Sequence, residues 1–241
     1  MRRILFACSL ALAAWHIAPA AAQTFNGQEQ AEIRAIVREY LVRNPDVLRE
    51  ALDALEARVT AERWQEVKSD ARDFSLGNAS APIVIVEYFD YRCPYCHAAY
   101  EWISDLARTR SDVRIVLKEL PVLGPESMEA ARAALASMPQ GRYWQFHRAM
   151  ITFRGDLTSE RIDQLAASVG IDVPRMRRAM ESPEITAQLE DVRAQAIEYN
   201  FNGTPGFVIN GQTVPGFNPP LLEQRLREAT RATRGARPAS D

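Results

Sequence analysis

Two cysteines separated by two residues are the most reactive feature of this sequence. Cys93 and Cys96 flank Pro94 and Tyr95, a spacing that brings two thiols within disulfide reach on one helical turn. Pro94 has no N–H, so it suits the first turn of a helix, where that donor would have no partner. Cys93 is therefore expected at a helix N-terminus, where backbone N–H groups favour the thiolate. These residues predict a reversible dithiol.

The elements that must position this pair follow from the hydrophobic pattern. The apolar run from Ile83 to Val86 predicts a buried strand, and residues 98–108 have helical spacing. A second strand is expected at 113–120 and a block of helices at 122–200. Residues 207–214 then form a hairpin around Asn210-Gly211, and a last helix begins at Pro219. The pattern predicts an α/β sheet domain with a helical insertion.

The net charge and the cysteine content limit the classes of function that the sequence supports. The net charge of −2 over 241 residues does not suggest nucleic-acid binding. The third cysteine, Cys8, lies in the expected leader. A secreted protein held together by disulfides would carry several cysteines spread along the chain, whereas this pair closes a very short loop. The sequence therefore favours a catalytic pair over a structural disulfide.

Residues 1–22 have the pattern of a signal peptide. Arg2 and Arg3 precede a mostly apolar stretch, and Ala20-Ala21-Ala22 offers a cleavage site. The alternatives are a membrane anchor, a lipoprotein cysteine at Cys8, and twin-arginine export. We expect cleavage and export to the periplasm.

Residues 29–70 predict two long amphipathic helices, the second beginning at Asn44-Pro45. Four apolar side chains in the second helix are spaced by four, three and four residues, which gives a one-sided seam: Leu48, Leu52, Leu55 and Val59. The seam must be buried, either on the same chain or on other copies of it. We expect a stalk that associates with itself.

The order of these elements resembles the thioredoxin fold of the DsbA family over residues 75–230. The resemblance is carried by residues 87–96, by the helical insertion and by residues 203–211. The N-terminal helices resemble the stalk of ScsC-type members, some of which are trimers. The resemblance implies an α/β thioredoxin fold with an inserted helical domain. It also implies a protein thiol-disulfide oxidoreductase that needs no cofactor and no metal.

The resemblance also assigns roles to individual residues. Cys93 is the nucleophile that forms a mixed disulfide, and Cys96 resolves it. Pro205 is a cis proline that faces the cysteines, and the backbone of Thr204 pairs with substrate as an added strand. Glu87 is a buried acid that assists proton transfer with Cys96, and the alternative for this residue is a solvent-exposed carboxylate.

Neighbouring residues are expected to tune the pair. Pro94 and Tyr95 set the donors around the Cys93 sulfur, and His97 either adds positive charge there or lies in solvent. The run from Cys93 to His97 also satisfies the C-x-x-C-H pattern of c-type haem attachment, and its side chains suit a soft ion such as Cu(I). We expect Met150, Met176 and Met180 to be packing residues, and His147 to be a core or a surface histidine.

The sequence therefore predicts an exported thiol-disulfide oxidoreductase, with a copper-binding or copper-tolerance thiol protein and a haem protein as alternatives. Its substrates would be exported cysteine-containing proteins, and its redox partner a membrane protein of DsbB or DsbD/ScsB type. We expect self-association through residues 29–70, and the resemblance to ScsC-type members implies a homo-trimer. The expected segments are a signal peptide (1–22), a helical segment (23–74), a DsbA-like domain (75–232) and a disordered tail (233–241).

Overall fold

The computed structural model describes residues 25–235, so the signal-peptide prediction for residues 1–22 lies outside the described part. The chain divides into two compact units, one ending at Leu55 and one starting at Glu56. Each unit is described separately below. Between residues 25 and 235 we find no helix that combines the length and the apolar character of a membrane span.

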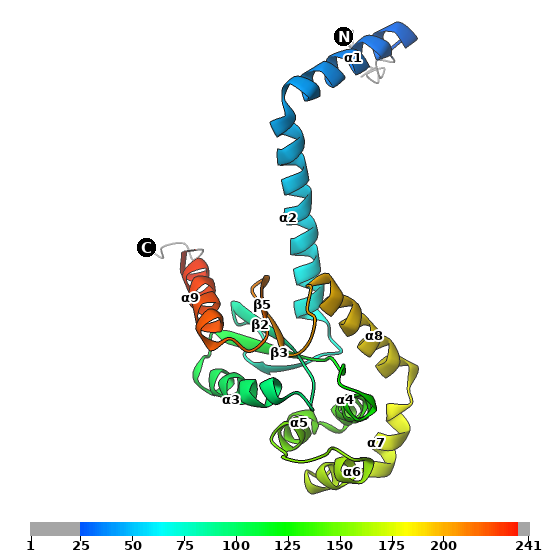
Figure 1. Ribbon diagram of the computed structural model, residues 1–241, viewed down its shortest axis with the longest axis vertical. Coiled ribbons are helices and arrows are strands. Elements are labelled where there is room, and N and C mark those ends of the chain that lie inside the picture. Colours follow the sequence, from blue (N-terminus) through cyan, green and yellow to red (C-terminus); the bar gives the residue numbers. More distant parts are fainter. Residues whose placement is uncertain (1–24, 236–241) are drawn as a thin grey trace, which may run out of the picture. The chain divides into compact units, whose positions relative to one another are not determined.

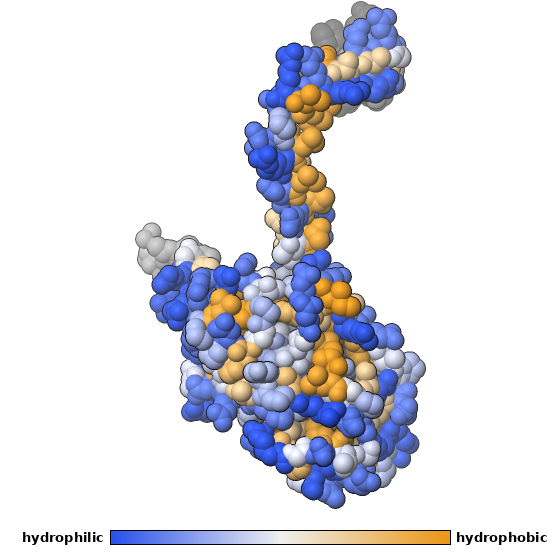
Figure 2. All heavy atoms as spheres, in the orientation of Figure 1, coloured by the Kyte–Doolittle hydropathy of each residue, from blue (hydrophilic) through white to orange (hydrophobic). Residues whose placement is uncertain are grey.

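The first unit is helical. Helix α1 (Gly27–Arg43) begins with a capping box, in which Asn26 and Glu29 each accept a backbone N–H from the other. Helix α2 (Pro45–Ser69) begins one residue after Asn44, as its proline predicts, and continues into the second unit. Most of the large apolar side chains of this unit are exposed, Leu52 at 64% and Leu55 at 57%. Figure 2 shows them as a stripe along α2.

The second unit contains a five-stranded sheet in the order β1-β3-β2-β4-β5 (Figure 1). Its strands are β1 (Phe74–Gly77), β2 (Ile83–Phe89), β3 (Val113–Glu119), β4 (Gly206–Ile209) and β5 (Gln212–Pro215). Strands β2 and β3 are parallel, and the other pairings are antiparallel. All seven residues of the central strand β2 are buried, which explains its nearly continuous apolar sequence.

Helices cover both faces of the sheet. Alternate residues of β2 pack into two different cores, Ile83, Ile85 and Phe89 into one and Val84, Val86 and Tyr88 into the other. The first core includes side chains of α3 (Pro94–Thr109) and α9 (Pro219–Gly235). The second includes Val67 of α2 and Val192 of α8 (Pro183–Glu198). This layering is the thioredoxin-type α/β fold that the sequence predicts.

The predicted helical insertion is confirmed between β3 and β4. It contains α4 (Pro125–Ser137), α5 (Tyr143–Ile151), α6 (Ser159–Ser168), α7 (Val173–Met180) and α8, with a short 3₁₀ turn at Met138–Gln140. Three of these helices begin with a side-chain cap, from Thr158, Asp172 and Ser182. The apolar faces of α4 to α7 join the first core, so the insertion is not a separate compact unit.

The observed boundaries differ from the predicted segments at two places. The predicted N-terminal segment ran to residue 74, but α2 already contributes Val67 and Trp64 to the second core. The four residues of β1 form an antiparallel edge strand on β3, which the sequence analysis missed. Helix α9 also continues to Gly235, three residues into the predicted tail, and residues 236–241 lie outside the described part.

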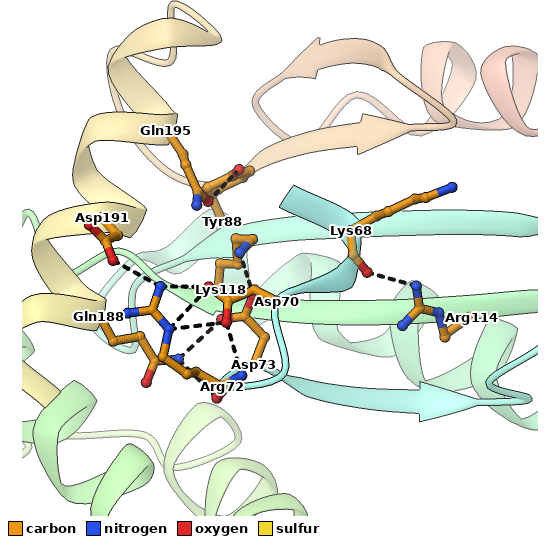
Figure 3. A network of polar contacts seen from close by, with 10 residues as sticks. All are labelled: Lys68, Asp70, Arg72, Asp73, Tyr88, Arg114, Lys118, Gln188, Asp191 and Gln195. Carbon is orange, nitrogen blue, oxygen red and sulfur yellow. Dashed lines mark hydrogen bonds and ion pairs between the residues drawn. The ribbon is translucent and has the colours of Figure 1, made fainter. Parts of the chain in front are cut away.

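A buried polar network ties the end of α2 to the sheet and to α8 (Figure 3). The Lys118 ammonium pairs with the Asp73 carboxylate, and neither side chain is more than 1% exposed. Gln188 of α8 donates to the other oxygen of Asp73 at 3.1 Å and to the Arg72 carbonyl at 2.9 Å. The buried charges of Lys118 and Asp73 therefore neutralise each other, and the removal of either charge would leave the other buried and unpaired.

We predict that Asp73→Asn lowers the free energy of unfolding by about 3–5 kcal/mol, because it leaves the Lys118 ammonium buried and unpaired. The double variant Asp73→Asn/Lys118→Met should recover most of this loss. Urea denaturation measures both values. Asp105→Asn is the matched control, since Asp105 forms an exposed ion pair with Arg108 and should change stability by less than about 1 kcal/mol. An equal loss in Asp73→Asn and the control would contradict the prediction.

Candidate functional site

The reactive site is built at the start of α3. Cys93 is the N-cap residue, with extended backbone (φ −80°, ψ 117°), and Pro94 occupies the first helical position. The Cys93 carbonyl accepts the N–H groups of Cys96 at 3.0 Å and His97 at 3.1 Å. No side-chain oxygen caps this helix. The sulfur of Cys93 is therefore placed where an N-cap oxygen usually lies, as the sequence predicts.

The loop before β4 lies against the Cys93 sulfur. In its protonated form the Cys93 thiol donates to the Thr204 carbonyl at 3.1 Å, and the Thr204–Pro205 peptide bond is cis, as the resemblance implies. The Thr204 hydroxyl is buried and has no partner among the described residues. It is therefore available to donate to a thiolate at Cys93. The structure brings Cys93, Thr204 and Pro205 together although Thr204 lies 111 residues further along the chain.

The two thiols have opposite acidities. A hydrogen bond from the Cys96 thiol lowers the pKa of Cys93 to about 5 against the opposing effect of burial, and the nearby Thr204 side chain and the backbone N–H groups of Cys96 and Tyr95 act in the same direction as Cys96. Burial raises the pKa of Cys96 well above its usual value, and its hydrogen bond to Cys93 raises it further. Both cysteines are free thiols. At neutral pH Cys93 is a thiolate and Cys96 is a proton donor to it.

Glu87 lies on β2 and is 4% exposed, so the alternative of a solvent-exposed carboxylate is wrong. Burial raises its pKa to about 8, and the negative charge of the Cys93 thiolate acts in the same direction. After burial and the hydrogen bond to Cys93, the negative charge of an ionised Glu87 is the next cause that raises the pKa of Cys96. The position therefore fits a buried acid beside the resolving thiol.

Asp90 organises the turn that precedes Cys93, and the sequence analysis did not identify it. One carboxylate oxygen accepts the Arg92 N–H at 2.8 Å and the Ser127 hydroxyl at 2.8 Å. The other oxygen accepts the N–H groups of Val122 at 2.8 Å and Leu123 at 3.0 Å. One feature of the sequence could have identified Asp90: it is an acidic residue that directly follows an apolar strand and precedes the first cysteine by three residues. Asp90 joins the reactive turn to the loop after β3.

A second buried cluster lies under this turn and was also missed. The hydroxyls of Tyr91 and Tyr143 donate to one oxygen of Glu119 at 3.0 and 2.7 Å, and His147 Nδ1 lies 3.1 Å from the Tyr91 hydroxyl. Burial raises the pKa of Glu119 and lowers that of His147 to about 3. His147 is therefore a neutral core residue, which decides between the core and surface positions that the sequence left open. The cluster anchors Tyr91, two residues before Cys93.

Tyr95 and His97 are the other residues predicted to tune the acidity of Cys93, and their surroundings differ. Tyr95 is 67% exposed, so its side chain is free to meet a partner. His97 Nε2 lies 2.6 Å from the Tyr91 carbonyl, and Arg154 approaches Nδ1 at 3.2 Å. An arginine can only donate, so Nδ1 accepts this hydrogen bond, and both ring nitrogens of His97 have a partner.

Other candidate ligands do not converge within the described residues. Met150, Met176 and Met180 are buried in the first core, as predicted. Over residues 25–235, no three side chains of histidine, cysteine, aspartate or glutamate cluster as a metal site would require. The site therefore consists of one activated thiolate, one buried thiol, one buried carboxyl group and the Thr204–Pro205 loop.

Comparisons with known proteins identify the family. Residues 84–227, more than half of the chain, match the model of the DSBA-like thioredoxin domain. Residues 29–62 match the N-terminal domain of the copper resistance protein ScsC. Among curated proteins, the Na⁺/H⁺ antiporter NhaA of Herminiimonas arsenicoxydans is 31% identical over 192 residues, which are 75% of this chain and 30% of that protein. The chain thus spans less than a third of this relative.

Solved structures agree with the family model. A thioredoxin-like oxidoreductase from Silicibacter pomeroyi is 38% identical with a TM-score of 0.66, and the match covers 71% of this chain and 98% of that one. A linker-deletion mutant of ScsC from Proteus mirabilis is 25% identical with a TM-score of 0.65, and the match covers 89% of this chain and all of that one. This chain belongs to the family of DsbA-like thioredoxin-domain proteins.

Proposed function

We propose that this protein is an exported oxidoreductase that exchanges the Cys93–Cys96 dithiol or disulfide with cysteines of other exported proteins. The observation that carries the proposal is the opposite acidity of two adjacent sulfurs, a pKa of about 5 for Cys93 beside a buried thiol whose pKa is raised. Only the thiolate attacks a disulfide at a useful rate, and only Cys93 is a thiolate at neutral pH.

The exchange has two steps in the reducing direction. The Cys93 thiolate attacks one sulfur of a partner disulfide, forms a mixed disulfide and releases the other partner sulfur as a thiolate. Cys96 then loses its proton, attacks the Cys93 sulfur and releases the second partner thiol, so the protein is oxidised and the partner reduced. Disulfide donation is the same sequence reversed. The Thr204 backbone, beside the Cys93 sulfur, would hold the partner as an added strand.

The direction of exchange depends on the redox partner. A membrane partner of DsbB type would keep the pair oxidised, and one of DsbD/ScsB type would keep it reduced for isomerisation. The second direction is supported by the match of residues 29–62 to the ScsC N-terminal domain and by the exposed seam of the first unit.

We predict that alkylation of Cys93 follows a single ionisation with a midpoint at about pH 5. Its rate should be constant above pH 6 and fall as the pH drops below 5, because the thiolate then takes up a proton. Iodoacetamide labelling of the reduced full-length chain, read by mass spectrometry, measures the profile. The urea-unfolded chain is the control and should titrate as an ordinary thiol.

The same proposal requires different roles for the two sulfurs. Cys96→Ser should accumulate mixed disulfides with disulfide-containing proteins, and Cys93→Ser should form none. A Cys93 midpoint close to that of the unfolded chain, or equal trapping by both variants, would overturn the proposed function.

Glu87 would accept the proton that Cys96 must lose during resolution. Since the carboxyl group accepts a proton only when it is ionised, the resolution rate should rise as the pH passes through about 8. We predict that Glu87→Gln slows resolution roughly tenfold or more and removes this rise. Single-turnover decay of a mixed disulfide measures the rate. As a control, the pH profile of Cys93 alkylation in Glu87→Gln should keep its single midpoint. If the resolution rate of Glu87→Gln depended on pH as in the wild type, Glu87 would not be the proton acceptor.

The seam of the first unit would be buried against other copies of the chain, in a trimer as in some ScsC-type proteins. Leu48, Leu52 and Leu55 are 49%, 64% and 57% exposed. A groove between α1 and α2, lined by Ile33 and Val37 among others, extends this apolar surface within the same unit. Exposed apolar surface of this extent is typical of an interaction site.

We predict that replacing Leu48, Leu52 and Leu55 with asparagine converts an oligomer to a monomer, because the seam loses its apolar contacts. Light scattering of the full-length chain measures the mass. Substitution is preferable to deletion of residues 29–70, since Trp64 and Val67 belong to the core of the second unit. The matched control replaces Arg49, Asp53 and Glu56 on the charged face and should keep the wild-type mass. A monomeric wild type would refute the prediction.

A further inference from the structure

Three asparagine residues of this chain directly precede a glycine: Asn26, Asn202 and Asn210. An asparagine in this position is prone to deamidation, because glycine has no side chain that would hinder an attack by its own backbone nitrogen. That nitrogen attacks the carbonyl carbon of the asparagine side chain, provided that the side chain is free to approach it. The surroundings of each asparagine therefore decide which of the three can react.

Hydrogen bonds hold two of the three side chains away from this reaction. The Asn26 Oδ1 atom accepts two backbone N–H groups from the first turn of α1, at 2.9 and 3.0 Å. The Asn210 Oδ1 atom accepts the Val84 N–H at 2.8 Å, and its Nδ2 atom donates to the Pro82 carbonyl at 3.4 Å. Each of these side chains must break two hydrogen bonds before its carbonyl carbon can meet the next backbone nitrogen.

Asn202 has no such restraint. It lies with Gly203 in an exposed segment that belongs to no helix or strand. Within residues 25–235, neither the Asn202 side chain nor the Gly203 N–H forms a hydrogen bond. No atom lies within 4 Å of the position that a Cβ atom would take on Gly203. Both the attacking nitrogen and the carbon that it attacks are therefore free to move.

The chain on both sides of this exposed segment is fixed. Phe201 is buried in the second core, and its N–H donates to a carbonyl of α8 at 2.9 Å. On the other side, the Thr204 carbonyl lies 3.1 Å from the Cys93 sulfur, and the Pro205 carbonyl accepts the Gly216 N–H at 2.8 Å. Only two residues connect these anchor points, so a change in the length of the backbone between them must displace one of them.

Deamidation makes such a change. The Gly203 nitrogen forms a bond to the side-chain carbon of Asn202, the bond from that carbon to the amide nitrogen breaks, and ammonia leaves with the proton of the Gly203 N–H. One water molecule then opens the resulting cyclic imide and yields either aspartate or isoaspartate. In isoaspartate the backbone runs through the side chain and contains one additional carbon atom. Both products add one negative charge.

We propose that Asn202 is a site of spontaneous deamidation, and that isoaspartate at this position displaces Thr204 from the Cys93 sulfur. The modification requires neither a partner protein nor disulfide exchange. Displacement of Phe201 would expose an aromatic side chain of the core, whereas Thr204 is already partly exposed, so Thr204 is the anchor that yields. Because the Thr204 side chain helps to lower the pKa of Cys93, its displacement raises that pKa.

Incubation of the full-length chain, kept reduced at neutral and mildly alkaline pH, tests the first part of the proposal. Peptide mapping by mass spectrometry measures deamidation at each asparagine, and electron-transfer fragmentation distinguishes isoaspartate from aspartate. We expect Asn202 to deamidate roughly tenfold faster than Asn26 or Asn210, because two hydrogen bonds must first break at each of those positions. The rate should rise with pH, since the attacking nitrogen must lose its proton.

The pH profile of Cys93 alkylation tests the second part. In the incubated chain, a fraction equal to the isoaspartate content should react with a midpoint above that of the fresh chain. Gly203→Ala is the matched control, because the loop has space for the methyl group and Gly203 does not have a left-handed backbone conformation. The methyl group hinders the attack, so Gly203→Ala should keep its initial midpoint throughout the incubation. Freshly prepared Asn202→Asp adds the charge without the longer backbone and should shift the midpoint less than isoaspartate does.

Each part of the proposal can fail separately. If Asn26 or Asn210 deamidated as fast as Asn202, Asn202 would not be a selective site. An unchanged Cys93 midpoint in chains that contain isoaspartate, or an equal shift in Asn202→Asp, would show that Thr204 is not displaced. If Cys93 of the fresh chain titrated as an ordinary thiol, the proposed function would fail, while peptide mapping would still decide whether Asn202 is modified.

Discussion

The position of Cys93 as the N-cap residue of α3 is the constraint on which the reactive site depends. The first turn of a helix has backbone N–H groups with no partner one turn earlier, and many helices satisfy one of them with a side-chain oxygen at the N-cap. Here the N-cap residue is Cys93 and no such oxygen is present. The hydrogen bond from the Cys96 thiol contributes most to the acidity of Cys93, and the backbone N–H groups at the start of the helix add to it.

The balance between hydrogen bonding and burial then separates the acidities of the two sulfurs that share this helix. Both side chains belong to the first core, Cys93 at 4% and Cys96 at 1% exposed. Hydrogen bonds outweigh burial at Cys93 and lower its pKa, whereas burial dominates at Cys96 and raises its pKa. Desolvation also keeps Glu87 protonated near neutral pH. The site thus combines one anionic nucleophile with two groups that are still protonated at neutral pH.

Asp90 links this chemistry to the surrounding surface. The parallel strands β2 and β3 end at the same edge of the sheet, and loops at such an edge commonly bind ligands. The Asp90 carboxylate accepts hydrogen bonds from both loops at this edge, so it links the reactive turn directly to the loop from Val122 to Leu123. Nearly thirty residues separate these two segments in the chain.

Sequence alone determined the features that depend on local rules: the dithiol, the proline that starts α3, the central strand, the hairpin at Asn210-Gly211 and the helical character of the insertion. Only the tertiary structure decided that Asp73 pairs with Lys118, that Glu119 joins Tyr91 and Tyr143, that β1 is a strand and that α2 contributes Trp64 and Val67 to the domain core. The reason is physical. The periodicity of a sequence shows which face of a helix or strand is apolar. It does not show which distant residue pairs with a buried charge, or which distant element packs against an apolar face.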